Sequence, residues 1–177
     1  MLLSRAAGIT CARRVTAPIV QRAMATMAPI TWGGDKKIPG LIYGRETAPA
    51  VIVVQEWWGV TDIVKQFALK IADNGYRVLV PDIYKGKIGV DREEAGHMMS
   101  NLDFANAVTE ISLAAEHLKA TGSPKVGITG FCMGGALTMG ALAASKDLTC
   151  GAPFYGVNCE SAKPAASDRT VFPLLGC

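Results

Sequence analysis

The chain has 177 residues, half of them hydrophobic, so it is long and apolar enough to bury the core of one domain and is not a disordered tail. Its formal charge of +3 reflects 18 basic and 15 acidic residues. Four arginines and no acid fall within residues 1–34, which leaves 14 basic against 15 acidic side chains elsewhere, so we predict no nucleic-acid partner.

The first 34 residues have the composition of an organelle transit peptide, with many alanines and no acidic residue. Their four arginines are Arg5, Arg13, Arg14 and Arg22. Import into an organelle uses basic, amphipathic, acid-poor segments of this kind. The alternative is a disordered, uncleaved extension. We therefore expect a mitochondrial or chloroplast protein if residues 1–34 are a transit peptide, and otherwise a cytoplasmic one.

Strand and helix signals alternate from residue 41 onward. Residues 41–43 predict a weak strand, and the β-branched run 51–54 is typical of a strand buried on both faces of a sheet. The helix expected next has Thr61 or Asp62 as its N-cap and stops at an Asn-Gly pair. Its apolar stripe is formed by Ile63, Phe67 and Ile71. Residues 77–80 then predict a second buried strand.

The alternation continues through the second half of the chain. Residues 91–99 predict a short helix, and a longer helix follows. The apolar stripe of the longer helix is Phe104, Val108, Ile111, Ala115 and Leu118. Residues 125–129 predict a third strand, 133–145 a helix of small residues, and 149–155 a fourth strand. Strands separated by helices imply an α/β fold, with a mostly parallel sheet and helices on both faces.

Neither a membrane-spanning segment nor a metal site is expected in this chain. No window after the first segment offers 18 uninterrupted apolar residues, because the longest stretch, residues 133–144, is short and contains three glycines. We therefore expect a soluble protein with no membrane partner. The five cysteines form no CxxC pair and there are two histidines, so the clustered ligands of a zinc site are absent and we predict no metal.

The segment GFCMGG lies between a predicted strand and a predicted helix, which is the context of a nucleophile elbow with Cys132 in the usual place of serine. Gly130 and Gly134 avoid a collision in the sharp turn, and Gly135 lets the helix pack closely. Cys132 then stands at a helix N-terminus, which favours a thiolate and a developing oxyanion. A buried structural cysteine or a phosphate loop is the alternative, but the GxGxxG pattern and the Walker lysine are missing.

A resemblance to the dienelactone hydrolase family is carried by three blocks, VIVVQEWWGV, RVLVPDIYKG and KVGITGFCMGG with GAPFYGV, over roughly residues 35–158. The Gln-Glu pair after a buried strand, combined with a cysteine nucleophile, is more specific than the elbow alone. The resemblance implies an α/β-hydrolase fold. It also implies hydrolysis of a small lactone or ester through a thioester acyl-enzyme, with no metal and no organic cofactor.

The resemblance assigns a role to individual residues. Cys132 corresponds to the nucleophile, and Glu56 corresponds to a buried glutamate that can accept the thiol proton if burial raises its pKa. The backbone N–H groups of Trp57 and Met133 correspond to the oxyanion hole. Trp57 and Trp58 either line the pocket or are core aromatics.

The chain departs from the family pattern after the nucleophile. The triad acid and histidine should both follow Cys132, but His97 and His117 precede it and are predicted to be helical and solvent-facing. Asp168 lacks the context of a triad acid and receives no role. Two cations, Lys85 and Arg92, lie where a substrate carboxylate could be caught, but we expect them to be solvated surface charges.

These patterns divide the chain into an extension (1–34), a partial hydrolase domain (35–158) and an irregular tail (159–177) in which the expected last strands and helix are missing. An open sheet edge would then favour self-association. We expect a hydrolase of small lactones or esters that is impaired by the missing triad members. The alternative is a non-catalytic α/β module whose Cys132 is a redox-sensitive or ligand-binding thiol.

Overall fold

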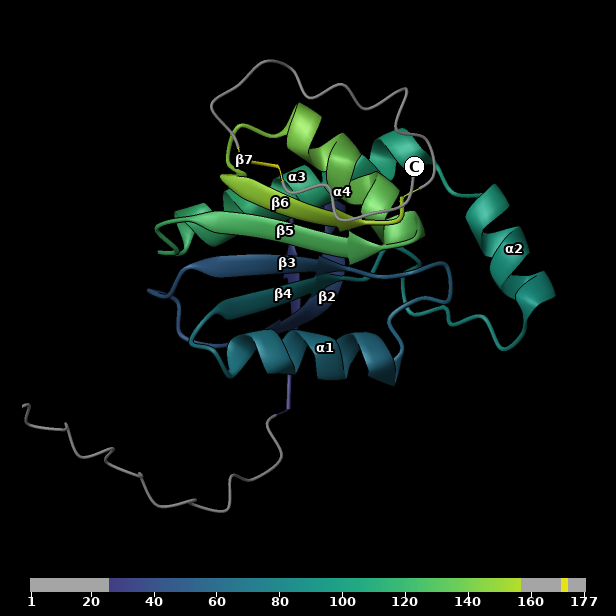
Figure 1. The fold of residues 1–177 in the computed structure, drawn as a ribbon, viewed down its shortest axis with the longest axis horizontal. Coiled ribbons are helices and arrows are strands. Elements are labelled where there is room, and N and C mark those ends of the chain that lie inside the picture. The colour runs from purple at the N-terminus through teal and green to yellow at the C-terminus, as the bar shows by residue number, and fades with distance from the viewer. Residues whose placement is uncertain (1–25, 157–169, 172–177) are drawn as a thin grey trace, which may run out of the picture.

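The computed structural model describes residues 26–156 and 170–171, which form a seven-stranded mixed sheet (Figure 1). The strand order is β1-β2-β4-β3-β5-β6-β7. The two antiparallel strands at one edge are β1 (Ala28–Trp32) and β2 (Ile38–Tyr43). The parallel strands are β4 (Arg77–Pro81), β3 (Ala50–Val54), β5 (Val126–Phe131), β6 (Cys150–Phe154) and β7 (Thr170–Val171). The predicted α/β fold with a mostly parallel sheet is confirmed.

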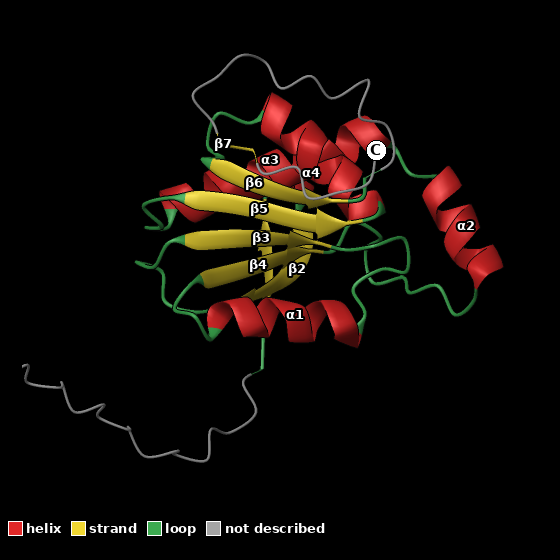
Figure 2. Ribbon diagram, viewed as in Figure 1, coloured by secondary structure: helices red, strands yellow, loops and turns green. Residues whose placement is uncertain are grey.

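The helices are α1 (Asp62–Ala72), α2 (Arg92–Ser100), α3 (Phe104–Ala120) and α4 (Met133–Ala144). α1 covers one face of the sheet, α3 and α4 cover the other, and α2 stands away from the sheet (Figure 2). Side-chain caps fix the starts of two helices, because Asp91 accepts from the Glu94 N–H and Asp103 accepts from the Asn106 N–H, each at 2.9 Å. Among the helices that the structure describes, none is long and apolar enough to cross a bilayer.

The sheet separates two apolar cores. On one face α3 and α4 pack over a cluster that includes Ile52, Val54 and Leu79, and on the other face α1 packs over Val53 and Val78. Successive side chains of a strand point to opposite faces, so the β-branched run of β3 contributes to both cores. The carboxyl ends of the parallel strands all lie at the same end of the sheet, where the loops with the candidate site residues begin.

The stripe predicted for α1 is displaced by one residue. The buried residues of α1 are Val64, Ala68 and Ala72, whereas Ile63 is 75% exposed. Small side chains let the helix approach the sheet closely, and the larger apolar residues then lie along its flank. This placement leaves apolar surface beside the loop that follows β3.

The folded part begins before residue 35. β1 lies within residues 1–34 and pairs with β2, and Trp32 is buried with its indole N–H donating to the Glu110 carbonyl at 3.3 Å. Composition did not separate this short strand from the arginine-containing segment, because both lack acidic residues. Residues 1–25 lie outside the described residues, so the transit peptide stays a prediction.

The tail predicted to be irregular contains one short strand. β7 pairs in parallel with the first two residues of β6, through Cys150 with Thr170 and Gly151 with Val171. The rest of residues 159–177 lies outside the described residues. In the part of the chain that is described, residues 152–154 of β6 have no strand on their outer side. Self-association through this edge stays a prediction.

Candidate active site

Cys132 lies at the tip of the turn between β5 and α4. Its backbone has φ 54° and ψ −121°, a conformation that residues other than glycine rarely adopt. Three backbone hydrogen bonds hold this turn: the Cys132 N–H donates to the Phe154 carbonyl at 3.1 Å, and the Cys132 carbonyl accepts from Gly135 at 2.9 Å and from Ala136 at 3.2 Å. Backbone strain of this kind is typical of functional positions.

The three elbow glycines lie against neighbouring backbone. A Cβ at Gly130 would collide with the Gly134 carbonyl, and a Cβ at Gly135 would collide with the Phe154 carbonyl. A Cβ at Gly134 would lie 2.5 Å from the Gln55 carbonyl oxygen at the end of β3. The turn and the helix that follows it therefore pack against β3 and β6 at distances that only glycine allows.

The start of α4 supplies unpaired backbone donors next to Cys132. Met133 is the first residue of this 12-residue helix, so no carbonyl one turn earlier in the helix accepts its N–H. The partial positive charge of the helix N-terminus falls at the same place. The Met133 side chain is buried.

Glu56 and Cys132 both follow the carboxyl ends of neighbouring parallel strands. β3 and β5 are parallel neighbours with Val54 opposite Gly130, and Glu56 and Cys132 each follow these paired residues by two positions. Burial raises the pKa of Glu56 above its usual value. Burial raises the pKa of Tyr155, and the charges of Glu56 and Cys132 add to the increase.

The side chains of Glu56 and Cys132 form no direct hydrogen bond with each other. In residues 26–156, no hydrogen bond joins the Glu56 carboxylate to the Cys132 thiol. A tight turn follows Glu56, because the Gly59 N–H donates to the Glu56 carbonyl at 3.2 Å. Among the described residues, no hydrogen bond is formed by the Cys132 sulfur.

Tyr84 is a residue of this site that the sequence analysis did not single out. Its side chain is buried, and its hydroxyl donates to the Met133 sulfur at 3.2 Å. Burial, together with the nearby charge of Cys132, raises the pKa of Tyr84 to about 12. Its position in the PDIYKG block after β4 was visible in the sequence, but nothing there showed that this loop folds back onto the elbow.

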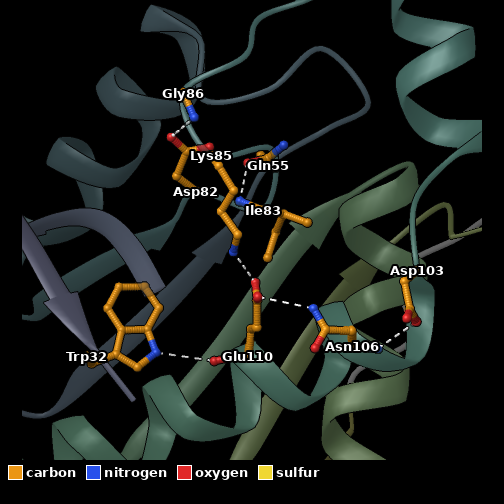
Figure 3. A network of polar contacts seen from close by, with 9 residues as sticks. All are labelled: Trp32, Gln55, Asp82, Ile83, Lys85, Gly86, Asp103, Asn106 and Glu110. Carbon is orange, nitrogen blue, oxygen red and sulfur yellow. Dashed lines mark hydrogen bonds and ion pairs between the residues drawn. The ribbon is translucent and has the colours of Figure 1, made fainter. Parts of the chain in front are cut away.

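Gln55 connects the loop after β3 to the loop after β4. Its side chain is fully buried, and its Oε1 accepts from the Ile83 N–H at 3.0 Å (Figure 3). The adjacent tryptophans, Trp57 and Trp58, pack edge to face with ring centroids 5.1 Å apart, and both are half-buried. Trp57 also packs against the larger core cluster. These contacts hold the Glu56 loop beside the Tyr84 loop.

Lys85 is an exposed surface cation, as the sequence predicted, but it has a partner that the sequence did not indicate. Its ammonium forms an ion pair with the carboxylate of Glu110, which is buried on α3 and also accepts from the Asn106 amide at 3.1 Å (Figure 3). The ion pair was not predicted because its partner lies 25 residues away in the sequence. Arg92, at the start of α2, is exposed as expected.

Neither described histidine is placed to serve Cys132. The His97 side chain is 73% exposed on α2, as predicted, with its Nε2 3.9 Å from Glu93. The prediction that His117 is solvent-facing was wrong: it is half-buried, its Nε2 has no hydrogen-bond partner in the described part of the chain, and burial followed by the charge of Arg77 lowers its pKa. Arg77 begins β4, at the edge of the sheet opposite Cys132. Asp168 lies outside the described residues.

Two cavities border this region. One, of about 220 Å³, lies between α1 and the end of β5 and has Glu56, Phe131 and Tyr155 among its lining residues. The other, of about 680 Å³, lies between α2 and the body of the domain and includes Tyr84 and Glu110 in its wall. Within the described ranges, no group of three or more His, Cys, Asp or Glu side chains could hold a metal ion.

The strained residue between β5 and α4, on a mostly parallel sheet covered on both faces, defines an α/β-hydrolase fold. The model of the dienelactone hydrolase family matches residues 38–176, and the chain belongs to this family. The structure is similar to a dienelactone hydrolase-like promiscuous phosphotriesterase, P91, from metagenomic libraries, with a TM-score of 0.62, 24% identity, and coverage of 74% of this chain and 59% of that one. At this identity the likeness shows the fold alone.

Two curated relatives illustrate the sequence similarity. The chain is 34% identical over 119 residues to protein usf of Aquifex pyrophilus, covering 62% of this chain and 52% of that protein. It is 27% identical over 141 residues to carboxymethylenebutenolidase 1 of Cupriavidus pinatubonensis, covering 72% of this chain and 60% of that protein. The chain thus spans little more than half the length of these relatives.

Proposed function

We propose that this chain acts on small lactones or esters through a cysteinyl thioester, with Cys132 as the nucleophile. The observation that carries this proposal is the backbone of Cys132, which is held at φ 54° on the turn before α4. Two glycine contacts and the hydrogen bond to the Phe154 carbonyl maintain the turn. Membership of the family and a relative named carboxymethylenebutenolidase 1 support the substrate class.

Glu56 takes the thiol proton in the proposed first step. The sulfur then attacks the carbonyl carbon of the substrate, a C–S bond forms, and the carbonyl oxygen becomes an oxyanion. The C–O bond to the alcohol breaks, and the departing oxygen receives the proton from Glu56. The products are an acyl-thioester on Cys132 and a free alcohol, or a single ring-opened chain when the substrate is a lactone.

The raised pKa of Glu56 and two backbone N–H groups suit this proton transfer. A carboxylate accepts a thiol proton more readily when burial brings its pKa closer to that of the thiol, and burial raises the pKa of Glu56. The N–H groups of Met133 and Trp57 would bind the oxyanion, one from the helix N-terminus and one from the loop after β3. In the described loops and turns, neither N–H donates to a backbone carbonyl.

We further propose that this chain hydrolyses its acyl-thioester slowly. Hydrolysis of the thioester needs a base to activate water, and neither His97 nor His117 lies at Cys132. Losing a triad member typically lowers the rate by about 10⁴- to 10⁶-fold. The acyl-thioester should therefore accumulate and be detectable.

The test is capture of the acyl group by mass spectrometry of the intact chain after reaction with 4-nitrophenyl acetate. We expect one acetyl group on Cys132 and one equivalent of 4-nitrophenolate released in a burst. Cys150 is an exposed free cysteine at the start of β6, so Cys150→Ala is the matched control and should still be acetylated, whereas Cys132→Ala should not. Absence of an adduct on Cys132, or equal labelling of both cysteines, would instead favour a non-catalytic module with a redox-sensitive or ligand-binding thiol.

A further inference from the structure

Three loops at the carboxyl ends of the parallel strands are joined to one another by side chains. The loop after β3 begins at Gln55, the loop after β4 contains Ile83 and Tyr84, and the turn after β5 leads to Met133. The Gln55 Oε1 accepts from the Ile83 N–H at 3.0 Å. The Tyr84 hydroxyl donates to the Met133 sulfur at 3.2 Å. Both contacts are buried, so water does not compete with them.

A third contact closes this connection into a ring. Gly134 follows Met133 in α4, and a Cβ at Gly134 would lie 2.5 Å from the Gln55 carbonyl oxygen, so the backbones of Gly134 and Gln55 are in contact. The connection therefore leaves Gln55 through its side chain, passes through the loop after β4 and the start of α4, and returns to the Gln55 backbone. We call these five residues the loop clamp: Gln55, Ile83, Tyr84, Met133 and Gly134.

The loop after β4, in the middle of the loop clamp, is anchored on its other side as well (Figure 3). Lys85 forms an ion pair with Glu110 of α3, and the Gly86 N–H donates to the Asp82 Oδ2 at 2.7 Å. The Asp82 N–H donates to the Pro39 carbonyl of β2 at 2.9 Å. A shift of this loop would break several of these bonds, so the loop provides a fixed point against which Gln55 and Met133 are held.

The sheet alone does not set the spacing of the two proposed oxyanion donors. Pairing of β3 with β5 ends where Val54 lies opposite Gly130. Trp57 and Met133 each follow these paired residues by three positions. Their N–H groups must reach the same oxyanion, each at about 2.7–3.1 Å, so a small change in their spacing removes one of the two hydrogen bonds.

The loop clamp connects these two donors. Met133 belongs to it directly. Trp57 is tied to Gln55 by a tight turn in which the Gly59 N–H donates to the Glu56 carbonyl at 3.2 Å. In the described part of the chain, no backbone hydrogen bond joins this turn to the start of α4, so the spacing of the donors depends on the side chains of the loop clamp.

Packing alone does not account for a glutamine at position 55. The Gln55 side chain is fully buried, and its Nε2 has no hydrogen-bond partner within residues 26–156. A buried donor without a partner costs stability, and an apolar side chain of similar length would avoid that cost. The hydrogen bond to the Ile83 N–H is what a glutamine provides here and an apolar residue does not.

We propose that Gln55 is a positioning residue of the active site. Through the loop clamp, its side chain fixes the Met133 N–H relative to the Trp57 N–H, so that both donate to the oxyanion formed when Cys132 is acylated. This inference rests on the proposed function, because it assigns a further residue to the same acylation step. Gln55 is fully buried and acts through the residues that it holds, without contacting the substrate.

The test compares two reactions of Cys132 that differ in their need for an oxyanion. Acylation by 4-nitrophenyl acetate passes through an oxyanion, whereas alkylation by iodoacetamide forms the C–S bond at a saturated carbon and expels iodide. Gln55→Met keeps a side chain of similar length and removes the acceptor oxygen. We expect this variant to lower the maximal rate of single-turnover acylation by about 10- to 100-fold, because both donors must be placed within a fraction of an ångström.

The form of the loss distinguishes positioning from a general loss of structure. The ester concentration that gives half the maximal acylation rate should change little, because the oxyanion is formed only in the transition state. Alkylation of Cys132 by Gln55→Met should differ from that of the parent chain by less than about twofold, because that reaction does not use the oxyanion hole.

Further variants follow the connection through the loop clamp. Tyr84→Phe keeps the ring and removes the contact with the Met133 sulfur, so it should lower acylation by about 2- to 10-fold, the range for one neutral hydrogen bond. The double variant Gln55→Met/Tyr84→Phe should lose little more than Gln55→Met alone, because both residues act through one connection. Ser123→Ala is the matched control and should change neither reaction. It removes a hydrogen bond from a buried side chain to the Glu46 carbonyl, at the opposite end of the sheet.

The outcomes separate this inference from the proposed function. An acylation rate of Gln55→Met equal to that of the parent chain, or an equal fall in acylation and alkylation, would overturn the inference and leave the proposed function standing. Failure of the parent chain to acylate Cys132 would overturn the proposed function, and with it the inference. If circular dichroism shows that Gln55→Met does not fold, Tyr84→Phe decides by the same comparison of acylation with alkylation.

Discussion

Gly134→Ala tests whether the packing of the elbow against β3 is as tight as the structure shows. The added Cβ would lie 2.5 Å from the Gln55 carbonyl oxygen and 2.7 Å from the Val54 carbonyl oxygen, where real Cβ atoms essentially never lie closer than 3.0 Å. Both oxygens belong to the backbone at the end of a central strand, so they cannot rotate away. The start of α4 must shift outward, away from β3.

The magnitude follows from two opposing effects. Overpacking of a well-packed site costs about 1–3 kcal/mol. Alanine in place of glycine within a helix returns up to about 1 kcal/mol through helix propensity. We therefore expect Gly134→Ala to lower the free energy of unfolding by about 1–2 kcal/mol. The shift of α4 should also slow alkylation of Cys132, because it moves the helix N-terminus relative to the sulfur.

Urea denaturation followed by circular dichroism measures the stability change, and iodoacetamide labelling measures the reactivity of Cys132. Gly96→Ala is the matched control, since Gly96 lies within α2 and a Cβ there meets no atom within 4 Å. That variant should be stabilised by about 0.5–1 kcal/mol. A Gly134→Ala protein as stable as the Gly96→Ala protein, with unchanged labelling, would refute the close approach of α4 to β3.

Three further predictions concern other parts of the molecule. The folded state lowers the pKa of His117 below its usual value of 6.5, so the unfolded chain binds more protons near that pH. The free energy of unfolding should therefore fall as the pH drops below about 6.5. Urea denaturation at several pH values measures this dependence, and His117→Gln should flatten it. Lys85→Ala leaves the buried Glu110 carboxylate without its cation and should cost about 1–3 kcal/mol, whereas Lys85→Arg should cost less; equal melts for all three proteins would contradict the role of this pair. If the outer edge of β6 pairs between molecules, Ala152→Lys should reduce the molecular mass measured by light scattering. A parent chain that is monomeric in the same measurement would contradict self-association through this edge.

The local parts of the candidate site could be predicted from the sequence because their causes lie in neighbouring residues. The turn around Cys132 needs small residues within a few positions, and these appear together as Gly130, Gly134 and Gly135. The strand and helix on either side show periodicity over short windows. The position of Glu56 after a buried strand then placed it at the same edge of the sheet, since parallel strands share the direction of their carboxyl ends.

The features that the sequence did not predict concern residues whose surroundings come from distant segments. Whether Lys85 has an ion-pair partner depends on Glu110, and whether His117 is exposed depends on how the end of α3 packs near Arg77. The face that α1 buries depends on how closely the sheet lets the helix approach, so hydrophobic spacing alone selected Ile63 instead of its neighbour. No short window of sequence contains this information.

The sequence by itself determined the alternation of strands and helices and the sharp turn at Cys132, because backbone sterics and side-chain periodicity act over a few residues. The tertiary structure decided that β1 joins the sheet and that the hydroxyl of Tyr84 reaches Met133. It also decided that α1 and the end of β5 enclose a cavity lined by Phe67, Phe131 and Tyr155. These features depend on segments far apart in the chain coming within a few ångströms of one another, and only the packing of the whole domain determines which of them do.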